Sequence, residues 1–203
     1  MAGTDRSWCD TTFGNVPEGV ASQMAAAAVV TVDGPYTGGV TEPWITELVG
    51  GLCKALGAHT VLETGSFLGH TTAHLATCLQ RRGGGRLIAC EIDPVRAKTV
   101  HDRLTGLDIP DVAFTVYAQD VIQVIRGLKD GELDFAFVDD DHGQSHVAVE
   151  IDLLLPKLRP GGLLTFHDVY GSCDLKRVVN AYGGYSLDFP RNGPAGGLGI
   201  LQR

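Results

Sequence analysis

From residue 59 onward, short apolar runs alternate with stretches whose apolar residues recur at helical spacing. The apolar runs are "HTVLET", "RLIACEID", "VAFTVYAQ", "LDFAFVDD" and "GGLLTFHD". Each precedes a helical stretch, such as "PVRAKTVHDRL", which opens on the proline that a first helical turn tolerates. Five nearly continuous apolar strands that alternate with helices indicate a parallel sheet with helices on both faces. The expected class is therefore α/β, with a doubly wound sheet.

The two ends of the chain depart from this alternation. "YSLDF" and "GLGILQR" flank the Pro/Gly-rich "PRNGPAG", which predicts an antiparallel hairpin at one edge of the sheet. Residues 41–57, "TEPWITELVGGLCKALG", predict one amphipathic helix with a capping Thr41 and a terminal glycine. Residues 1–40 are rich in Gly, Thr and Ala, and we interpret them as a partly ordered N-terminal lid segment. We expect the main domain to span residues 41–203.

Composition excludes several classes of protein. The formal charge of −8 argues against a general nucleic-acid binder, which needs a basic face. No run approaches the ~20 apolar residues of a membrane span, and the segment before "MAAAAVV" lacks the basic residues of a secretory signal. Five dispersed cysteines without a C-x-x-C pair predict reduced thiols and a cytoplasmic protein, with Cys90 in the core.

Polar side chains stand at the end of every strand candidate. They are Glu63; Glu91 and Asp93; Gln119 and Asp120; Asp139; and Asp168. In open parallel sheets, ligands bind outside these carboxyl ends. Each acid has an alternative interpretation as a helix cap, which we weight equally for Asp93 and Asp120 and less for Glu91.

The glycine turn after the first strand indicates what the ligand is. Its pattern is E-x-G-x-x-x-G, with Glu63, Gly65 and Gly69, whereas a dinucleotide fold uses G-x-G-x-x-G. An acid before the turn suits a cationic ligand end rather than a pyrophosphate, and the acid Glu91 suits ribose hydroxyls. S-adenosylmethionine satisfies both demands. A nucleotide-cofactor (NAD-type) oxidoreductase and a cofactor-binding partner protein without transferase activity stay open as alternatives.

These motifs resemble those of class I S-adenosylmethionine-dependent methyltransferases, in particular catechol/caffeoyl-CoA-type O-methyltransferases and their relatives that act on antibiotic sugars. "VLETGSFLGHTT" is similar to the first motif of that group, "ACEIDP" to its ribose motif and "AQDVIQVI" to its adenine-side motif. "LDFAFVDDDH" and "RPGGLLTFHDV" resemble the strand ends that carry the chemistry. The resemblance implies a Rossmann-like sheet with strand order 3-2-1-4-5-7-6 and an antiparallel strand 7.

The resemblance also assigns cofactor contacts one position at a time. It implies that Gly65, Ser66 and Gly69 line the methionine part and that Thr71 binds its carboxylate. It places Glu91 on the ribose, Ala118 and Gln119 beside the adenine, and Asp139 near the amino group. Thr41 would close over the cofactor, and this transfer is the least direct.

Two further strand ends carry the implied chemistry. Asp139 and Asp168 occupy the positions of metal carboxylates, and with His167 they could hold Mg²⁺ or another divalent metal. The chain has Val169 where the catechol type usually has Asn, and His167 where the sugar type has an acid, so a bound metal stays open. His142 stands at the position of the family's general base, and a solvated first-turn histidine is its alternative.

The acceptor is the least specified part of the prediction. We expect a small molecule with a hydroxyl group, such as a natural product, sugar or phenol, and Trp44 and Tyr170 are the aromatic residues expected beside it. His146 lies four residues after His142, and we expect a supporting polar role for it rather than a shared metal site. A homodimer is an assembly that the sequence leaves open.

Overall fold

A computed structural model describes residues 41–170, 174–189 and 196–203, so the predicted lid at residues 1–40 lies outside the described residues. The strands are β1 (Thr60–Thr64), β2 (Gly85–Cys90), β3 (Val112–Tyr117), β4 (Leu133–Val138), β5 (Leu158–His167), β6 (Tyr185–Leu187) and β7 (Leu198–Gln202). The helices are α2 (Pro43–Leu56), α3 (His70–Arg81), α4 (Pro94–Thr105), α5 (Val121–Gly127), α6 (Gln144–Lys157) and α7 (Leu175–Ala181).

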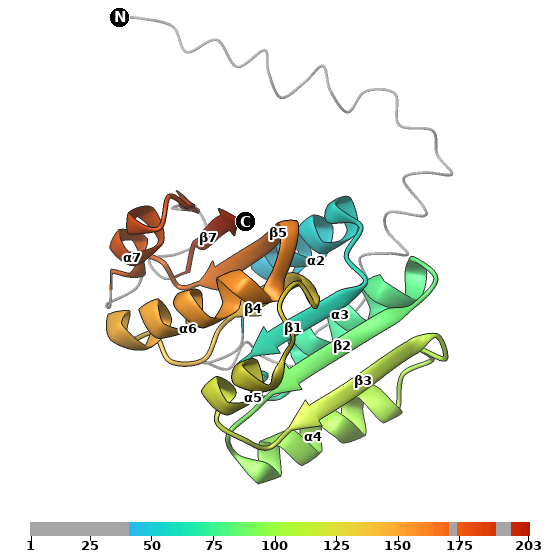
Figure 1. Ribbon diagram of the computed structural model, residues 1–203. Coiled ribbons are helices and arrows are strands. Elements are labelled where there is room, and N and C mark those ends of the chain that lie inside the picture. Colours follow the sequence, from blue (N-terminus) through green and yellow to red (C-terminus); the bar gives the residue numbers. More distant parts are fainter. Residues whose placement is uncertain (1–40, 171–173, 190–195) are drawn as a thin grey trace, which may run out of the picture. The chain divides into compact units, whose positions relative to one another are not determined.

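The seven strands form one sheet in the order β3-β2-β1-β4-β5-β7-β6 (Figure 1). Strands β1 to β5 are parallel, and β7 runs antiparallel to both β5 and β6. The predicted α/β class, strand order and edge hairpin are therefore confirmed. Because β1 pairs with β2 on one side and β4 on the other, the order reverses between β1 and β4, which is where such sheets bind ligands.

Helices cover both faces of the sheet, as the continuous apolar strands require. Helices α2, α3 and α4 pack on one face, where Phe135 and Phe137 of β4 are fully buried. Helices α5, α6 and α7 pack on the other, where Ala136 and Val138 of the same strand point. Cys90 belongs to this second core, as predicted. The alternation along β4 thus divides one apolar run between two cores.

The starts of α4 and α5 show whether Asp93 and Asp120 are free to contact a ligand or serve as helix caps. Asp93 caps α4 by accepting hydrogen bonds from the amides of Val95 and Arg96. Asp120 caps α5 through the amide of Ile122. Since these carboxylates serve backbone donors, the capping interpretation holds for both.

The predicted cap of α2 is wrong in detail. Glu42, not Thr41, is the N-cap residue, and its side chain makes no capping hydrogen bond. The hydroxyl of Thr41 instead donates to Asp139 Oδ2 at 2.7 Å, so it ties this helix to the end of β4. The predicted terminal glycine is confirmed, because Gly57 ends the helix with φ 72°.

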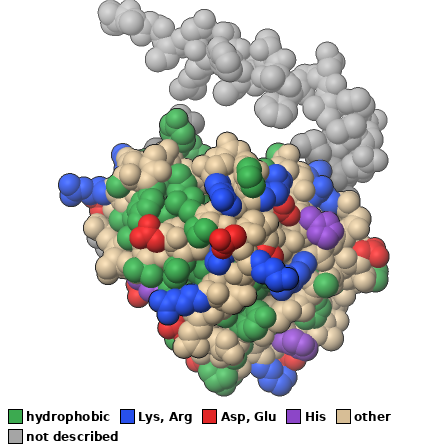
Figure 2. Space-filling model, viewed as in Figure 1, with side chains coloured by type: hydrophobic (Ala, Val, Ile, Leu, Met, Phe, Trp, Pro, Cys, Tyr) green, Lys and Arg blue, Asp and Glu red, His purple; other side chains and the backbone are tan. Residues whose placement is uncertain are grey.

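The surface carries charges of both signs. Figure 2 shows acidic and basic side chains mixed over the face that bears α5, α6 and α7. Among the described residues, none of the helices is long and apolar enough to cross a bilayer.

Candidate active site

A cavity of about 820 Å³ opens at the carboxyl ends of the strands, within the size range of small-molecule sites. Eleven predicted site residues line it: Thr41, Glu63, Gly65, Ser66, Thr71, Glu91, Gln119, Asp139, His142, His167 and Asp168. They come from all five parallel strand ends, from the turn after β1 and from the start of α2. The topology therefore gathers residues that are up to 127 positions apart in sequence into one site.

Gly65 is required where the turn after β1 meets the end of β4. Its φ is 73°, and a Cβ built there would lie 2.2 Å from the carbonyl oxygen of Asp139. The amide of Asp139 also donates to the carbonyl of Thr64 at 3.2 Å. A glycine at this position thus lets two strand ends approach at the centre of the cavity.

The buried side chain of Glu63 stabilises the turn after β1 through hydrogen bonds. It is 2% exposed, and one of its carboxylate oxygens accepts hydrogen bonds from the hydroxyls of Ser66, at 2.9 Å, and Thr72. Burial raises the pKa of Glu63 to about 7, although both hydroxyls act to lower it. The structure therefore gives Glu63 a bracing role, while its predicted attraction for a cationic ligand stays a prediction.

Glu91 shapes the corner after β2. Its two oxygens accept from the amides of Phe67 and Asp93, each at 2.9 Å, and the guanidinium of Arg96 lies 3.9 Å away. The same guanidinium stacks 5.0 Å from the ring centre of Phe67. Each carboxylate oxygen can accept a second hydrogen bond, so Glu91 can still bind ribose hydroxyls as predicted.

Four predicted residues do not line this cavity. Gly69 begins α3 with φ 77°, and the space a side chain would fill is occupied by Val100, so its freedom serves helix packing. Ala118 is exposed beyond β3. Trp44 is 38% exposed, and Tyr170 packs on the edge hairpin, where its hydroxyl lies 3.4 Å from the carbonyl of Ser186. The cofactor and acceptor contacts predicted for these residues stay predictions.

His167 joins two carboxylates that are distant in sequence. Its Nε2 lies 2.6 Å from Glu42 and its Nδ1 lies 2.9 Å from Asp139, and the ring is 6% exposed. Burial acts to lower the pKa of His167, but the two hydrogen-bonded carboxylates outweigh it and raise the pKa to about 10. His167 is therefore a buried imidazolium at neutral pH. The same contact lowers the pKa of Glu42, against the opposing effect of burial.

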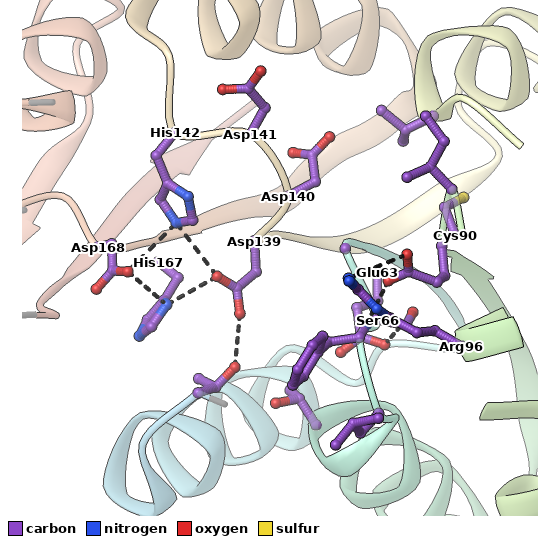
Figure 3. A pocket seen from close by; sticks show the side chains of 18 of the residues that line it. Glu63, Ser66, Cys90, Arg96, Asp139, Asp140, Asp141, His142, His167 and Asp168 are labelled. Atoms are coloured by element: carbon purple, nitrogen blue, oxygen red, sulfur yellow. Dashed lines mark hydrogen bonds and ion pairs between the residues drawn. The ribbon is translucent and has the colours of Figure 1, made fainter. Parts of the chain in front are cut away.

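His142 faces the cavity from the loop between β4 and α6. Its Nε2 lies 3.5 Å from both Asp139 Oδ1 and Asp168 Oδ2 (Figure 3). These distances are too long for hydrogen bonds, and this buried nitrogen has no hydrogen-bond partner among the described residues. Asp139 raises the pKa of His142 above its ordinary value, against the opposing effect of burial.

The donor set around His142 fits a divalent cation. The donor atoms of Asp139, His142 and His167 all lie within 4.8 Å of one another, and imidazole with carboxylates suits Mn²⁺, Fe²⁺ or Zn²⁺. His167 is a poorer ligand than predicted, because both of its nitrogens already engage carboxylates. Its imidazolium also supplies positive charge beside Asp139. A second group of possible ligands joins Glu42, His167 and Asp168, and the predicted metal site at Asp139, His167 and Asp168 stays a prediction.

Glu42, at the centre of the site, was not predicted from the sequence. Glu42 looks like an ordinary acid at a helix start, yet it is the second partner of His167. No signal in the sequence pointed to this contact, because the two residues are 125 positions apart. His70, which replaces an aromatic of the resembling family, lines the cavity with its Nδ1 3.5 Å from Arg103.

Comparison with known proteins identifies the family of the chain. The profile of the family described as "Methyltransferase domain" matches residues 62–169, which is 108 of the 203 residues. A search of curated proteins found no match. The chain therefore belongs to the methyltransferase-domain family.

Solved structures share the whole fold at low identity. An O-methyltransferase from Bacillus cereus in complex with SAH has a TM-score of 0.67 and 18% identity, covering 95% of this chain and 94% of its own. The O-methyltransferase TomG from Streptomyces achromogenes, involved in tomaymycin synthesis and in complex with SAM, has a TM-score of 0.65 and 19% identity, with coverage of 96% and 94%. An SAH-bound methyltransferase from Podospora anserina, PaMTH1, has a TM-score of 0.65 and 11% identity, with coverage of 100% and 98%. The fold is that of class I S-adenosylmethionine-dependent methyltransferases.

Proposed function

We propose that this protein transfers the methyl group of S-adenosylmethionine to a hydroxyl of a small molecule, with His142 as the general base. The observation that carries the proposal is the unpartnered Nε2 of His142 at the cavity wall, between Asp139 and Asp168. A base must have a nitrogen within reach of its substrate, and the position of His142 in the cavity lining supports this role. The related folds bound to SAM or SAH support the choice of cofactor.

The cofactor would lie across the glycine turn. Ser66, Gly65 and Thr71 line the end of the cavity expected to take the methionine part, and Glu91 and Gln119 line the ribose and adenine end. Asp139 is an acceptor for the amino group, because burial would raise its pKa but the imidazoles of His142 and His167 outweigh that effect and lower it. The net negative lining favours a cationic sulfonium over a pyrophosphate, which argues against the NAD-type alternative.

Methyl transfer is an in-line displacement at the sulfonium methyl carbon. The acceptor oxygen forms the new C–O bond while the C–S bond breaks, and its electron pair returns to sulfur to give S-adenosylhomocysteine. The hydroxyl proton passes to His142 Nε2, and the resulting imidazolium is stabilised by Asp139 and Asp168, 3.5 Å away. His167 fixes Asp139 during this step. A divalent cation held by Asp139 and Asp168 would lower the pKa of an acceptor hydroxyl; His142 Nε2 would not hold it, because its lone pair accepts the proton.

Two measurements test the cofactor and the base in turn. Calorimetry should show binding of S-adenosylmethionine and S-adenosylhomocysteine but not of NAD; the reverse result would overturn the proposal. Release of S-adenosylhomocysteine should then be followed against a panel of phenols, catechols and sugars. With an active acceptor, His142→Gln should lower kcat by about 10²–10⁴-fold with little change in cofactor Kd.

The control for this substitution is His101→Gln, since His101 is an exposed histidine on α4 far from the cavity lining. It should retain full turnover. If His142→Gln also retained full turnover, the base assignment would be wrong while the cofactor assignment stood. Full activity after treatment with EDTA would refute assistance by a metal.

A further inference from the structure

A second cluster of ligating side chains lies beside the active site but takes no part in the chemistry proposed above. It consists of Asp140 at the end of β4 and His146 and Glu150 on α6, whose donor atoms all lie within 4.8 Å of one another. Asp140 follows Asp139 directly, yet its carboxylate points away from that of Asp139 (Figure 3). His146 therefore faces a different carboxylate from His142, and the two histidines do not form one pair.

Glu150 is the unusual member of this cluster. Its side chain is fully buried, and neither carboxyl oxygen has a hydrogen-bond partner among the described residues. A buried polar group without a partner costs about 1–3 kcal/mol, so such groups in native proteins need an explanation. Burial raises the pKa of Glu150, and the charges of Asp140 and Asp141 act in the same direction.

The spacing of the donors suits a small divalent ion. His146 Nε2 lies 3.0 Å from Asp140 Oδ2 and 3.6 Å from Glu150 Oε2. A tetrahedral ion with ligand bonds of 2.0–2.1 Å needs donor atoms ~3.3 Å apart. The measured separations lie on either side of this value, so the cluster could close around an ion with small side-chain movements.

We propose that Asp140, His146 and Glu150 form a second metal site, which binds a divalent transition metal such as Zn²⁺. One imidazole and two carboxylates suit this class of ion better than Mg²⁺ or Ca²⁺, which prefer oxygen ligands alone. Asp140 and His146 also line the cavity, which gives the ion an entry path and leaves room for a water as fourth ligand. The bound ion would join α6 to the end of β4, on which Asp139 and His142 depend for their positions.

The test must separate this site from the donors around His142. Asp139→Asn/Asp168→Asn removes two carboxylates there and serves as the background. The chelator-treated full chain is then titrated with Zn²⁺ by calorimetry and with Co²⁺, whose visible spectrum reports coordination. We expect the background variant to bind one equivalent of either ion and to gain thermal stability with it.

Adding Glu150→Gln to this background should weaken binding at least about 10-fold and alter the Co²⁺ spectrum. Gln matches the shape of the protonated Glu150, so the variant is expected to fold; if its melting shows that it does not, His146→Gln at a 28% exposed side chain replaces it. Glu47→Gln, on the exposed side of α2, is the matched control and should bind as the background does. A background variant that binds no ion, or Glu150→Gln binding as tightly as the control, would overturn the proposal.

Discussion

Gly65→Ala tests whether the turn after β1 and the end of β4 are as close as the structure places them. The new Cβ would lie 2.2 Å from the carbonyl oxygen of Asp139 and 2.6 Å from the Cα of Asp140, so backbone must move to admit it. Two costs add. An L-residue at φ 73° costs about 1–2 kcal/mol, and overpacking against backbone costs about 1–3 kcal/mol. The expected loss in unfolding free energy is about 2–5 kcal/mol.

Gly131→Ala is a matched control, because Gly131 has φ 71° but nothing within 4 Å of its built Cβ. It bears the conformational cost alone, about 1–2 kcal/mol. The gain from restricting the unfolded chain is the same for both variants and cancels in the comparison.

Urea denaturation of both variants measures the difference, and Gly65→Ala should be less stable than Gly131→Ala by about 1–3 kcal/mol. In a thermal melt each kcal/mol corresponds to about 2–4 °C for a chain of this size. Affinity for S-adenosylmethionine should fall in Gly65→Ala only, since Asp139 moves with the displaced strand end. Equal stability of the two variants within about 0.5 kcal/mol would refute the close approach.

Three other substitutions probe the site. Glu63→Gln tests the raised pKa: the unfolded carboxyl loses its proton near pH 4.5 and the folded one near pH 7, so wild-type stability should fall as pH rises through this window, by at most roughly 3 kcal/mol. Urea denaturation at pH 4.5 and pH 8 should show that the variant lacks this fall. An equal change in unfolding free energy between the two pH values in the wild type and the variant would contradict the raised pKa. Glu91→Ala should weaken binding of S-adenosylmethionine at least about 10-fold by calorimetry, since hydrogen bonds to a charged group are lost; unchanged affinity would remove Glu91 from the ribose site. Glu42→Gln leaves the buried imidazolium of His167 with one carboxylate fewer, and should lower the unfolding free energy by about 3 kcal/mol, while exposed Glu47→Gln should change it little.

The fold could be predicted from the sequence because its signals are local. Apolar runs of strand length, each followed by helical spacing, fix a parallel sheet whichever residues contact one another. The turn at Gly65 and the caps at Asp93 and Asp120 likewise depend on only a few neighbouring residues in the sequence. Even here, Thr41 looked like a cap because capping is the commonest use of a threonine before a helix, whereas a contact with Asp139, 98 residues away, competes for its hydroxyl.

The site could be predicted only in part, because its electrostatics depend on long-range contacts. The strand-end rule brought Asp139, His142 and Asp168 together correctly, since it follows from topology. It could not show that Glu42 reaches His167 across 125 positions, nor that the buried carboxyl of Glu150 has no hydrogen-bond partner among the described residues. Both facts depend on how a helix packs against the sheet, which apolar spacing leaves undetermined.

The charge distribution gives the two histidines of the site separate roles. His167 is enclosed by Glu42 and Asp139, whose carboxylates raise its pKa to about 10 against the effect of burial, so we assign it no proton transfer with the substrate. His142 shares Asp139 but lines the cavity, and its Nε2 has no hydrogen-bond partner within the described part of the chain, so we assign the proton transfer to it. The fixed charge on His167 also acts to lower the pKa of His142, against the two carboxylates that raise it. The cation behind the base therefore offsets part of the rise in pKa that Asp139 and Asp168 cause, while the net shift stays upward.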